Sequence, residues 1–184
     1  MNYKDYQNSR DAAWRLLIDT KVGELPIRPG AMCRALGIKV RYYIPEDGND
    51  GMSFLDNGVP TILVSSVAPL RRQRFTAAHE LGHILLGHVG RYALVNREPS
   101  AKDNPIEQAA NVFASRLLAP ACVLWGCNAR TAEEIATLCD ISMQAAQFRA
   151  ERMDVLYQRD KFLTSPLERE VYRQFADYIA GHKL

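Results

Sequence analysis

The sequence predicts an α+β fold, in which a small three-stranded sheet packs with a pair of helices and a helical region follows. Stretches rich in β-branched and aromatic residues come early in the chain, at 38–44, 52–55 and 60–65. Two segments with apolar residues at helical spacing come next, at 74–88 and 104–120. Beyond Pro120 the patterns are helical only. Strands followed by helices in this way are typical of an α+β architecture.

Length and composition suit a globular protein with one main domain and a small appendage. The chain has 184 residues, of which 47% are apolar and 24% charged. We expect a first domain over residues 1–125 and a helical subdomain over 126–184. Residues 1–11 are polar and lack the apolar core of a signal peptide, which predicts a cytoplasmic protein without a membrane segment. In that compartment the four cysteines are expected to be free thiols.

The first 65 residues are expected to alternate helices and strands. Residues 9–20 have the apolar spacing of a helix, with Ser9 as its cap. A short helix over 31–36 precedes the strand at 38–44. The next two strands flank Asp56-Asn57-Gly58, a sequence typical of a tight hairpin turn.

The helical segment 74–88 contains the motif His79-Glu80-Leu81-Gly82-His83. Histidines four residues apart lie on the same face of a helix, so both rings can reach one ion. Zinc accepts imidazole nitrogen and keeps a position open for water when three protein ligands are present. Glu80 is then placed to act on that water as a general base. The alternative, a polar helix with two surface histidines, fits poorly because the segment is mostly apolar and burying such groups without a partner is costly.

A third ligand is needed, and His88 does not have the required spacing. The longer motif H-E-x-x-H-x-x-G-x-x-H places its last histidine six residues after the second, whereas His88 is five residues after His83. We therefore expect His88 to be a residue of the helix end, with Gly87 as the cap.

Glu107 is the better candidate for the third ligand. It lies near the start of the segment 104–120, whose apolar face must pack on another element. Packed antiparallel to the first helix, this segment would bring Glu107 to the two histidines, with Asn111 one turn on to orient a ligand. A second interpretation needs no metal: Asn104 as N-cap and Glu107 in the first turn also form a capping arrangement. Spacing alone does not decide between them.

Two motifs together resemble the ImmA/IrrE family of bacterial zinc metallopeptidases, which is gluzincin-like. The first is Arg74-x-x-x-Ala78-His79-Glu80-Leu81-Gly82-His83-x-x-Leu86, and the second is Glu107-x-x-Ala110-Asn111-x-Phe113-Ala114-x-x-Leu117-Leu118-x-Pro120. The resemblance implies that His79, His83 and Glu107 bind the metal and that Glu80 is catalytic. It also implies a zincin-type pair of active-site helices. Zinc is the expected metal, although Mn²⁺ or Fe²⁺ also suits such a site.

Two further features bear on a peptidase site. Substrate chains of zinc peptidases commonly add as a strand to an exposed sheet edge, and one strand of the hairpin is a candidate edge. The alternative is that the sheet only supports the helix. The polar stretch 88–104 is expected to be a loop, and its Tyr92 or Arg91 is a candidate oxyanion stabiliser, unless both are ordinary loop residues.

The C-terminal region is predicted to be helical and to resemble a helix-turn-helix unit. A capping box at Thr131–Glu134 opens one helix, a turn at 139–142 follows, and 143–156 forms a second helix. Residues 131–184 hold seven basic and nine acidic groups, which disfavours direct DNA binding and favours packing or docking of a partner. A terminal helix is expected over 165–181, capped by Ser165.

The sequence thus predicts a zinc-dependent endopeptidase. By resemblance, its protein substrate is a helix-turn-helix repressor, and cleavage relieves repression in a stress response, mobile element or prophage. The alternative is a non-catalytic metal-binding regulator that binds a repressor or DNA through its C-terminal helices. Glu80 favours the enzyme, because a structural metal site has no need of it. The sequence does not indicate an oligomeric state.

Overall fold

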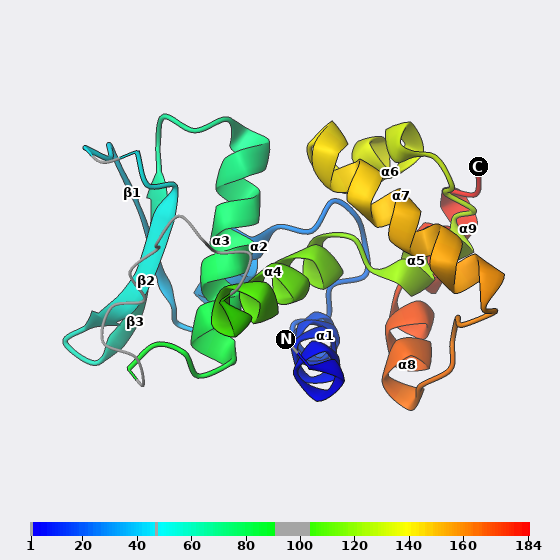
Figure 1. The fold of residues 1–184 in the computed structure, drawn as a ribbon, viewed down its shortest axis with the longest axis horizontal. Coiled ribbons are helices and arrows are strands. Elements are labelled where there is room, and N and C mark those ends of the chain that lie inside the picture. The colour runs from blue at the N-terminus through cyan, green and yellow to red at the C-terminus, as the bar shows by residue number, and fades with distance from the viewer. Residues whose placement is uncertain (1, 47, 91–103) are drawn as a thin grey trace. The chain divides into compact units, whose positions relative to one another are not determined.

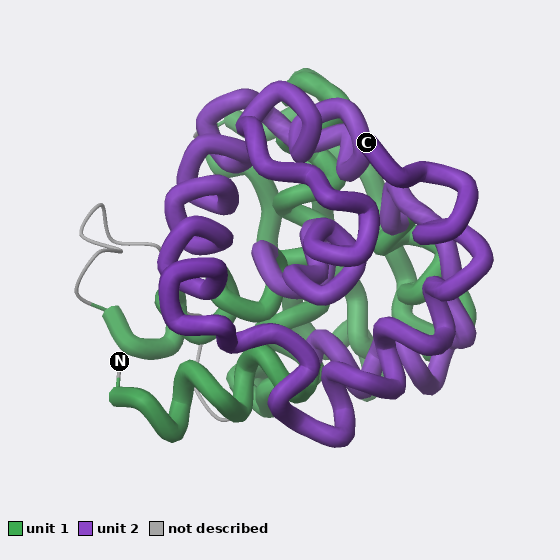
Figure 2. The backbone as a smooth tube through the Cα atoms, turned by 90° about the vertical axis from the view of Figure 1, so that its right-hand side faces the viewer, with its two compact units in different colours: residues 1–12, 28–114 green, residues 13–27, 115–184 purple. Residues whose placement is uncertain are grey.

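The computed structural model describes residues 2–46, 48–90 and 104–184, and it confirms the α+β fold (Figure 1). The chain divides into two compact units (Figure 2): unit 1 comprises residues 1–12 and 28–114, and unit 2 comprises residues 13–27 and 115–184. Helices α1 (Tyr3–Asp19) and α4 (Pro105–Leu118) contribute residues to both units. The boundary between residues 125 and 126 stays a prediction.

Unit 1 contains a three-stranded mixed sheet with the order β1-β3-β2. Its strands are β1 (Lys39–Tyr43), β2 (Gly51–Asp56) and β3 (Val59–Ser65). β1 runs parallel to β3, and β2 runs antiparallel to it. Asn57 and Gly58 join β2 to β3 with φ values of 51° and 80°, as a two-residue primed turn requires. The predicted hairpin is confirmed, and β2 lies at an edge of the sheet.

Helix α3 (Leu70–Leu85) carries the H-E-x-x-H motif and lies beside the sheet (Figure 1). Its residues from Thr76 to His83 are all buried, as expected of a helix covered on every side. At Gly51 an added Cβ would lie 2.5 Å from Cγ2 of Thr76, so the start of β2 approaches α3 closely. A shorter helix, α2 (Pro29–Ala35), precedes β1.

Helix α4 meets α3 at a glycine. A Cβ added at Gly82 would lie 2.9 Å from Cδ1 of Phe113, a side chain that is fully buried. Figure 1 shows α4 crossing α3, so the expectation that the two helices lie antiparallel is wrong. The contact at Gly82 explains the crossing, because a glycine lets two helices touch over a short length.

The helical stretch Pro105–Gly126, which includes α4, is long and apolar enough to pass a compositional test for a membrane span. However, 67% of its most apolar 18-residue segment is buried inside the protein. Burial of this extent is what the core helix of a globular protein shows.

Unit 2 is helical and has its own apolar core. Its further helices are α5 (Ala121–Gly126), α6 (Ala132–Cys139), α7 (Met143–Gln158), α8 (Pro166–Gln174) and α9 (Ala176–Gly181). The predicted capping box of Thr131 and Glu134 is confirmed, as is the Ser165 cap. The predicted single terminal helix is instead two helices that meet at Phe175. α5 was not predicted from the sequence.

The first helix begins earlier than the sequence suggested. Asn2 supplies the cap, since its Oδ1 accepts a hydrogen bond from the backbone N–H of Asp5 at 2.9 Å. Ser9 is not a cap: it lies within α1, and its hydroxyl donates to the carbonyl of Asp5 at 2.9 Å. The four cysteines are free and buried, as expected.

Candidate metal centre

Three buried side chains converge between α3 and α4. Nε2 of His79 lies 3.0 Å from Nε2 of His83, because residues four apart on α3 share a face. Glu107, in the first turn of α4, places Oε2 at 3.2 Å from Nε2 of His79 and Oε1 at 3.3 Å from Nε2 of His83. All three side chains thus direct one potential ligand atom to the same point.

The spacing of these atoms fits a small divalent cation. Zinc binds imidazole nitrogen and carboxylate oxygen at about 2.0–2.2 Å, so two ligands of a tetrahedral ion lie about 3.3–3.6 Å apart. The two Nε2 atoms lie 3.0 Å apart, and they lie 3.2 and 3.3 Å from the two different carboxylate oxygens of Glu107, distances close to that value. Two histidines and one glutamate also form a donor set that leaves a coordination position free.

Burial makes a partner for this cluster necessary. His79, His83 and Glu107 are each at most 5% exposed. Oε1 of Glu107 is buried and accepts no hydrogen bond from the described part of the chain. The proximity of His79, and next of His83, holds the pKa of Glu107 well below its ordinary range. The carboxylate is therefore ionised, and its free lone pair is available to a cation.

Asn111 fixes the ring of His79. Its Oδ1 lies 3.0 Å from Nδ1 of His79. An amide oxygen is only an acceptor, so Nδ1 of His79 carries the proton and Nε2 keeps the lone pair that a metal ligand needs. Asn111 lies one turn after Glu107 on α4, where the sequence placed it.

His83 has a partner that the sequence did not reveal. Its Nδ1 lies 3.0 Å from Nδ1 of His88. Burial is the main cause that lowers the pKa of His88 to about 4, so that ring is neutral near pH 7. The position of His88 at the end of α3 is as expected, but its contact with His83 depends on how the chain turns after the helix.

Glu80 faces the sheet. It is 3% exposed, and its Oε2 accepts a hydrogen bond from the hydroxyl of Ser53 on β2 at 2.8 Å. Sequence reasoning did not single out Ser53, because nothing in the local pattern of β2 shows which face meets α3. The alternation of a strand becomes informative only when its register is known.

The contacts of Glu107 favour a role at the two histidines over a role in capping α4. Asn104 does cap α4, with its Oδ1 accepting from the backbone N–H of Ile106 at 2.9 Å. Both carboxylate oxygens of Glu107 point instead to the histidines of α3. Tyr92 and Arg91, the candidate oxyanion stabilisers, lie outside the described residues.

Comparison with known proteins identifies the family of this chain. The family described as the IrrE N-terminal-like domain, Peptidase_M78, matches residues 33–151. The chain belongs to the M78 peptidase family. The match covers both α3 and α4, and it continues through α6 into α7. The H-E-x-x-H helix and the Glu107 helix thus lie within the M78 region.

One M78 relative is the radiation response metalloprotease IrrE of Deinococcus radiodurans. It is 31% identical to this chain over 148 residues, an alignment that covers 74% of this chain and 44% of that protein. The chain spans less than half the length of this relative. The similarity therefore concerns the aligned region only, and the rest of the longer protein has no counterpart in the alignment.

Proposed function

We propose that this chain is a zinc-dependent endopeptidase. The observation that carries the proposal is the convergence of His79, His83 and Glu107 within 3.0–3.3 Å of one another on two crossing helices. These residues would hold the metal, and Mn²⁺ or Fe²⁺ would suit the same donors. Membership of the M78 family supports a peptidase activity.

The proposed chemistry needs a base beside the metal ligands, and we assign that role to Glu80, which follows His79 in the H-E-x-x-H motif. A bound zinc ion would polarise the substrate carbonyl and lower the pKa of a water molecule. Glu80 would remove the proton from the attacking water and pass it to the leaving amine. Asn111 would keep His79 in the tautomer that binds metal. Ser53, by its hydrogen bond, would hold the carboxylate of Glu80 in place.

The proposed substrate is a protein, presented as an extended segment along β2. Among the described strands β2 pairs with β3 alone, at the end of the order β1-β3-β2. Ser53 on this strand contacts Glu80, which places the edge strand next to the proposed base. A strand added at that edge would run past the metal ligands.

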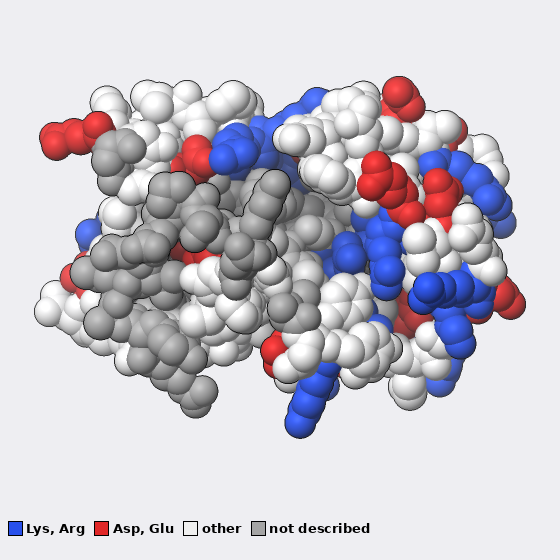
Figure 3. All heavy atoms as spheres, viewed as in Figure 1, with Lys and Arg blue, Asp and Glu red and all other residues white. Residues whose placement is uncertain are grey.

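We further propose that the substrate is a helix-turn-helix repressor, cleaved in a cytoplasmic stress response. Family resemblance supports this, and the relative from Deinococcus radiodurans is a radiation response protein by name. Direct DNA binding by this chain is not part of the proposal. On the face shown in Figure 3, basic and acidic side chains are interspersed over the C-terminal helices, whereas phosphate binding needs a basic surface.

The test compares new protein N-termini in cells that express the wild type or Glu80→Gln. We expect a few new termini in the wild type only, within a helix-turn-helix repressor, while Glu80→Gln keeps its zinc. Glu133→Gln, an exposed change on α6, is the matched control and should behave as the wild type. Identical termini in wild type and Glu80→Gln, under stress as well as at rest, would refute the peptidase and favour a binding regulator.

A further inference from the structure

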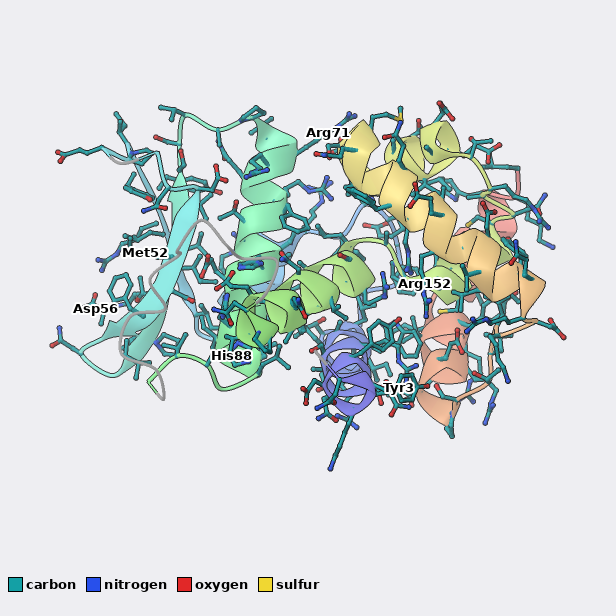
Figure 4. All side chains as sticks on the ribbon, viewed as in Figure 1. Tyr3, Met52, Asp56, Arg71, His88 and Arg152 are labelled. Atoms are coloured by element: carbon teal, nitrogen blue, oxygen red, sulfur yellow. The ribbon has the colours of Figure 1, made fainter. Side chains whose placement is uncertain are left out.

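His88 lies at the C-terminal end of α3 (Figure 4), where its ring contacts that of a proposed metal ligand. The two rings, His83 and His88, meet edge to face with centroids 5.1 Å apart. We propose that His88 is a positioning residue, which holds His83 in the orientation and tautomer required for metal binding. The inference rests on the proposed function and adds a residue to its site.

The backbone at the end of α3 explains why the two rings meet. Gly87 has a φ of 73°, a conformation that glycine adopts without strain. The chain then turns back, and the N–H of His88 donates to the carbonyl of His83 at 2.9 Å while that of Gly87 donates to Ile84 at 3.1 Å. This is the Schellman ending of a helix. His83 and His88 are therefore joined twice, once through the backbone and once through the side chains.

The side-chain contact has one arrangement that is compatible with metal binding. Nε2 of His83 faces His79 and Glu107, so it must keep its lone pair. The ring proton of His83 then lies on Nδ1 and is donated to Nδ1 of His88 at 3.0 Å. His88 in turn carries its proton on Nε2.

His79, the other proposed histidine ligand, has a corresponding contact at its own Nδ1. Asn111 accepts from Nδ1 of His79 at 3.0 Å, and His88 accepts from Nδ1 of His83 at the same distance. Each of the two histidine ligands thus has an acceptor at its Nδ1, and the two acceptors impose the same tautomer on both rings. His88 is not a fourth ligand in this arrangement, because it contacts the Nδ1 side of His83 and not the Nε2 side.

The test measures zinc affinity by competition with a chromophoric chelator at neutral pH. His88→Leu fills the space of the ring with an apolar side chain that cannot accept a hydrogen bond, and we expect zinc to bind about 10–100-fold more weakly. His88→Asn should restore most of the affinity, because its amide oxygen accepts as that of Asn111 does. His182→Ala is the matched control, since His182 is exposed in unit 2 and contacts Tyr178. If residue 88 only filled space, His88→Asn would not bind zinc more tightly than His88→Leu.

A second readout is the tautomer of His83, observed in long-range ¹H–¹⁵N spectra of the imidazole nitrogens. We expect a single Nδ1-protonated form in the wild type and in His88→Asn, and a mixture in His88→Leu. If His88→Leu bound zinc as tightly as the wild type with the tautomer unchanged, the inference would be wrong while the proposed function stood. If the wild type itself bound no zinc, Mn²⁺ or Fe²⁺, the proposed function would fail and this inference with it.

Discussion

The hydroxyl of Ser53 on β2 donates a hydrogen bond of 2.8 Å to Oε2 of Glu80 on α3. The two residues are 27 positions apart in the chain, and the packing of the sheet on α3 brings them together. Glu80 is buried, and this contact helps to restrain its carboxylate. In the proposed mechanism, a base that is already held in position speeds the reaction more than one that must first be oriented.

We expect Ser53→Ala to lower kcat for a cleaved peptide roughly tenfold, the effect of losing about 1.4 kcal/mol of transition-state stabilisation. Zinc content and KM should stay near the wild-type values, because the Ser53 hydroxyl donates to Glu80 and not to one of the three proposed ligands. Ser53→Thr retains a hydroxyl and should recover most of the rate. Ser66→Ala is the control, since the Ser66 hydroxyl donates to Tyr43. An unchanged kcat in Ser53→Ala would remove Ser53 from the mechanism.

The close contact of Gly82 with Phe113 predicts the effect of a single methyl group. In Gly82→Ala the new Cβ would lie 2.9 Å from Cδ1 of a fully buried ring. Overpacking of this kind costs roughly 1–3 kcal/mol, which exceeds the gain of about 1 kcal/mol that alanine brings to a helix. We expect a lower free energy of unfolding in urea, and weaker zinc binding because α4 and Glu107 are displaced.

The control for that change is Gly30→Ala on α2, where an added Cβ meets no atom within 4 Å. This variant should be as stable as the wild type or slightly more so, with normal zinc affinity. Equal stability of Gly82→Ala and Gly30→Ala would show that α3 and α4 separate without cost.

Removal of metal tests the role of Glu107. Zinc at 100 times its dissociation constant would stabilise the folded protein by about 2.7 kcal/mol, so a chelator should lower the Tm of the wild type. Glu107→Ala should stay folded, lose stoichiometric zinc and show no change in Tm with chelator. Glu170→Ala, an exposed change on α8, should respond as the wild type does. Retention of tightly bound zinc by Glu107→Ala would leave Glu107 as a residue of the helix start only.

The capping box of α6 gives a prediction about pH. Backbone N–H groups of Thr131 and Arg130 donate to Oε2 of Glu134 at 2.9 and 2.7 Å, and these bonds lower the pKa of Glu134. A lowered folded-state pKa means that the stabilisation is present above the unfolded value of about 4.3 and is lost as the pH falls below it. We expect Glu134→Gln to be less stable than the wild type by roughly 0.5–1 kcal/mol at pH 7.

Urea unfolding of both proteins between pH 7 and pH 3 measures this difference, which should shrink as the pH falls below about 4.3. Glu133→Gln is the control, because Glu133 shares the first turn of α6 but does not receive these two hydrogen bonds. A stability difference for Glu134→Gln that stayed constant over the whole range would show that the charge of Glu134 does not contribute to the cap.

Features that depend on near neighbours in the chain were predicted well. The α+β fold, the hairpin at Asn57-Gly58, the caps at Thr131 and Ser165 and the burial of the H-E-x-x-H helix were all confirmed. The errors concern helix ends and breaks. Ser9 resembled a cap but bonds within α1, and the break at Phe175 divides a helix whose apolar pattern is continuous.

The sequence by itself determined that two histidines would share one face of a buried helix, because a spacing of four residues sets that geometry wherever the helix lies. It left Glu107 with two interpretations, since a first-turn glutamate can serve its own helix or another. Only the tertiary structure decided where Glu107 points: α4 lies across α3 at Gly82, and both oxygens of Glu107 lie beside the histidines, which favours the role outside its own helix. The contact of Ser53 depends on strand register, and that of His88 depends on the turn after α3. Neither can be predicted from the spacing of residues along the chain.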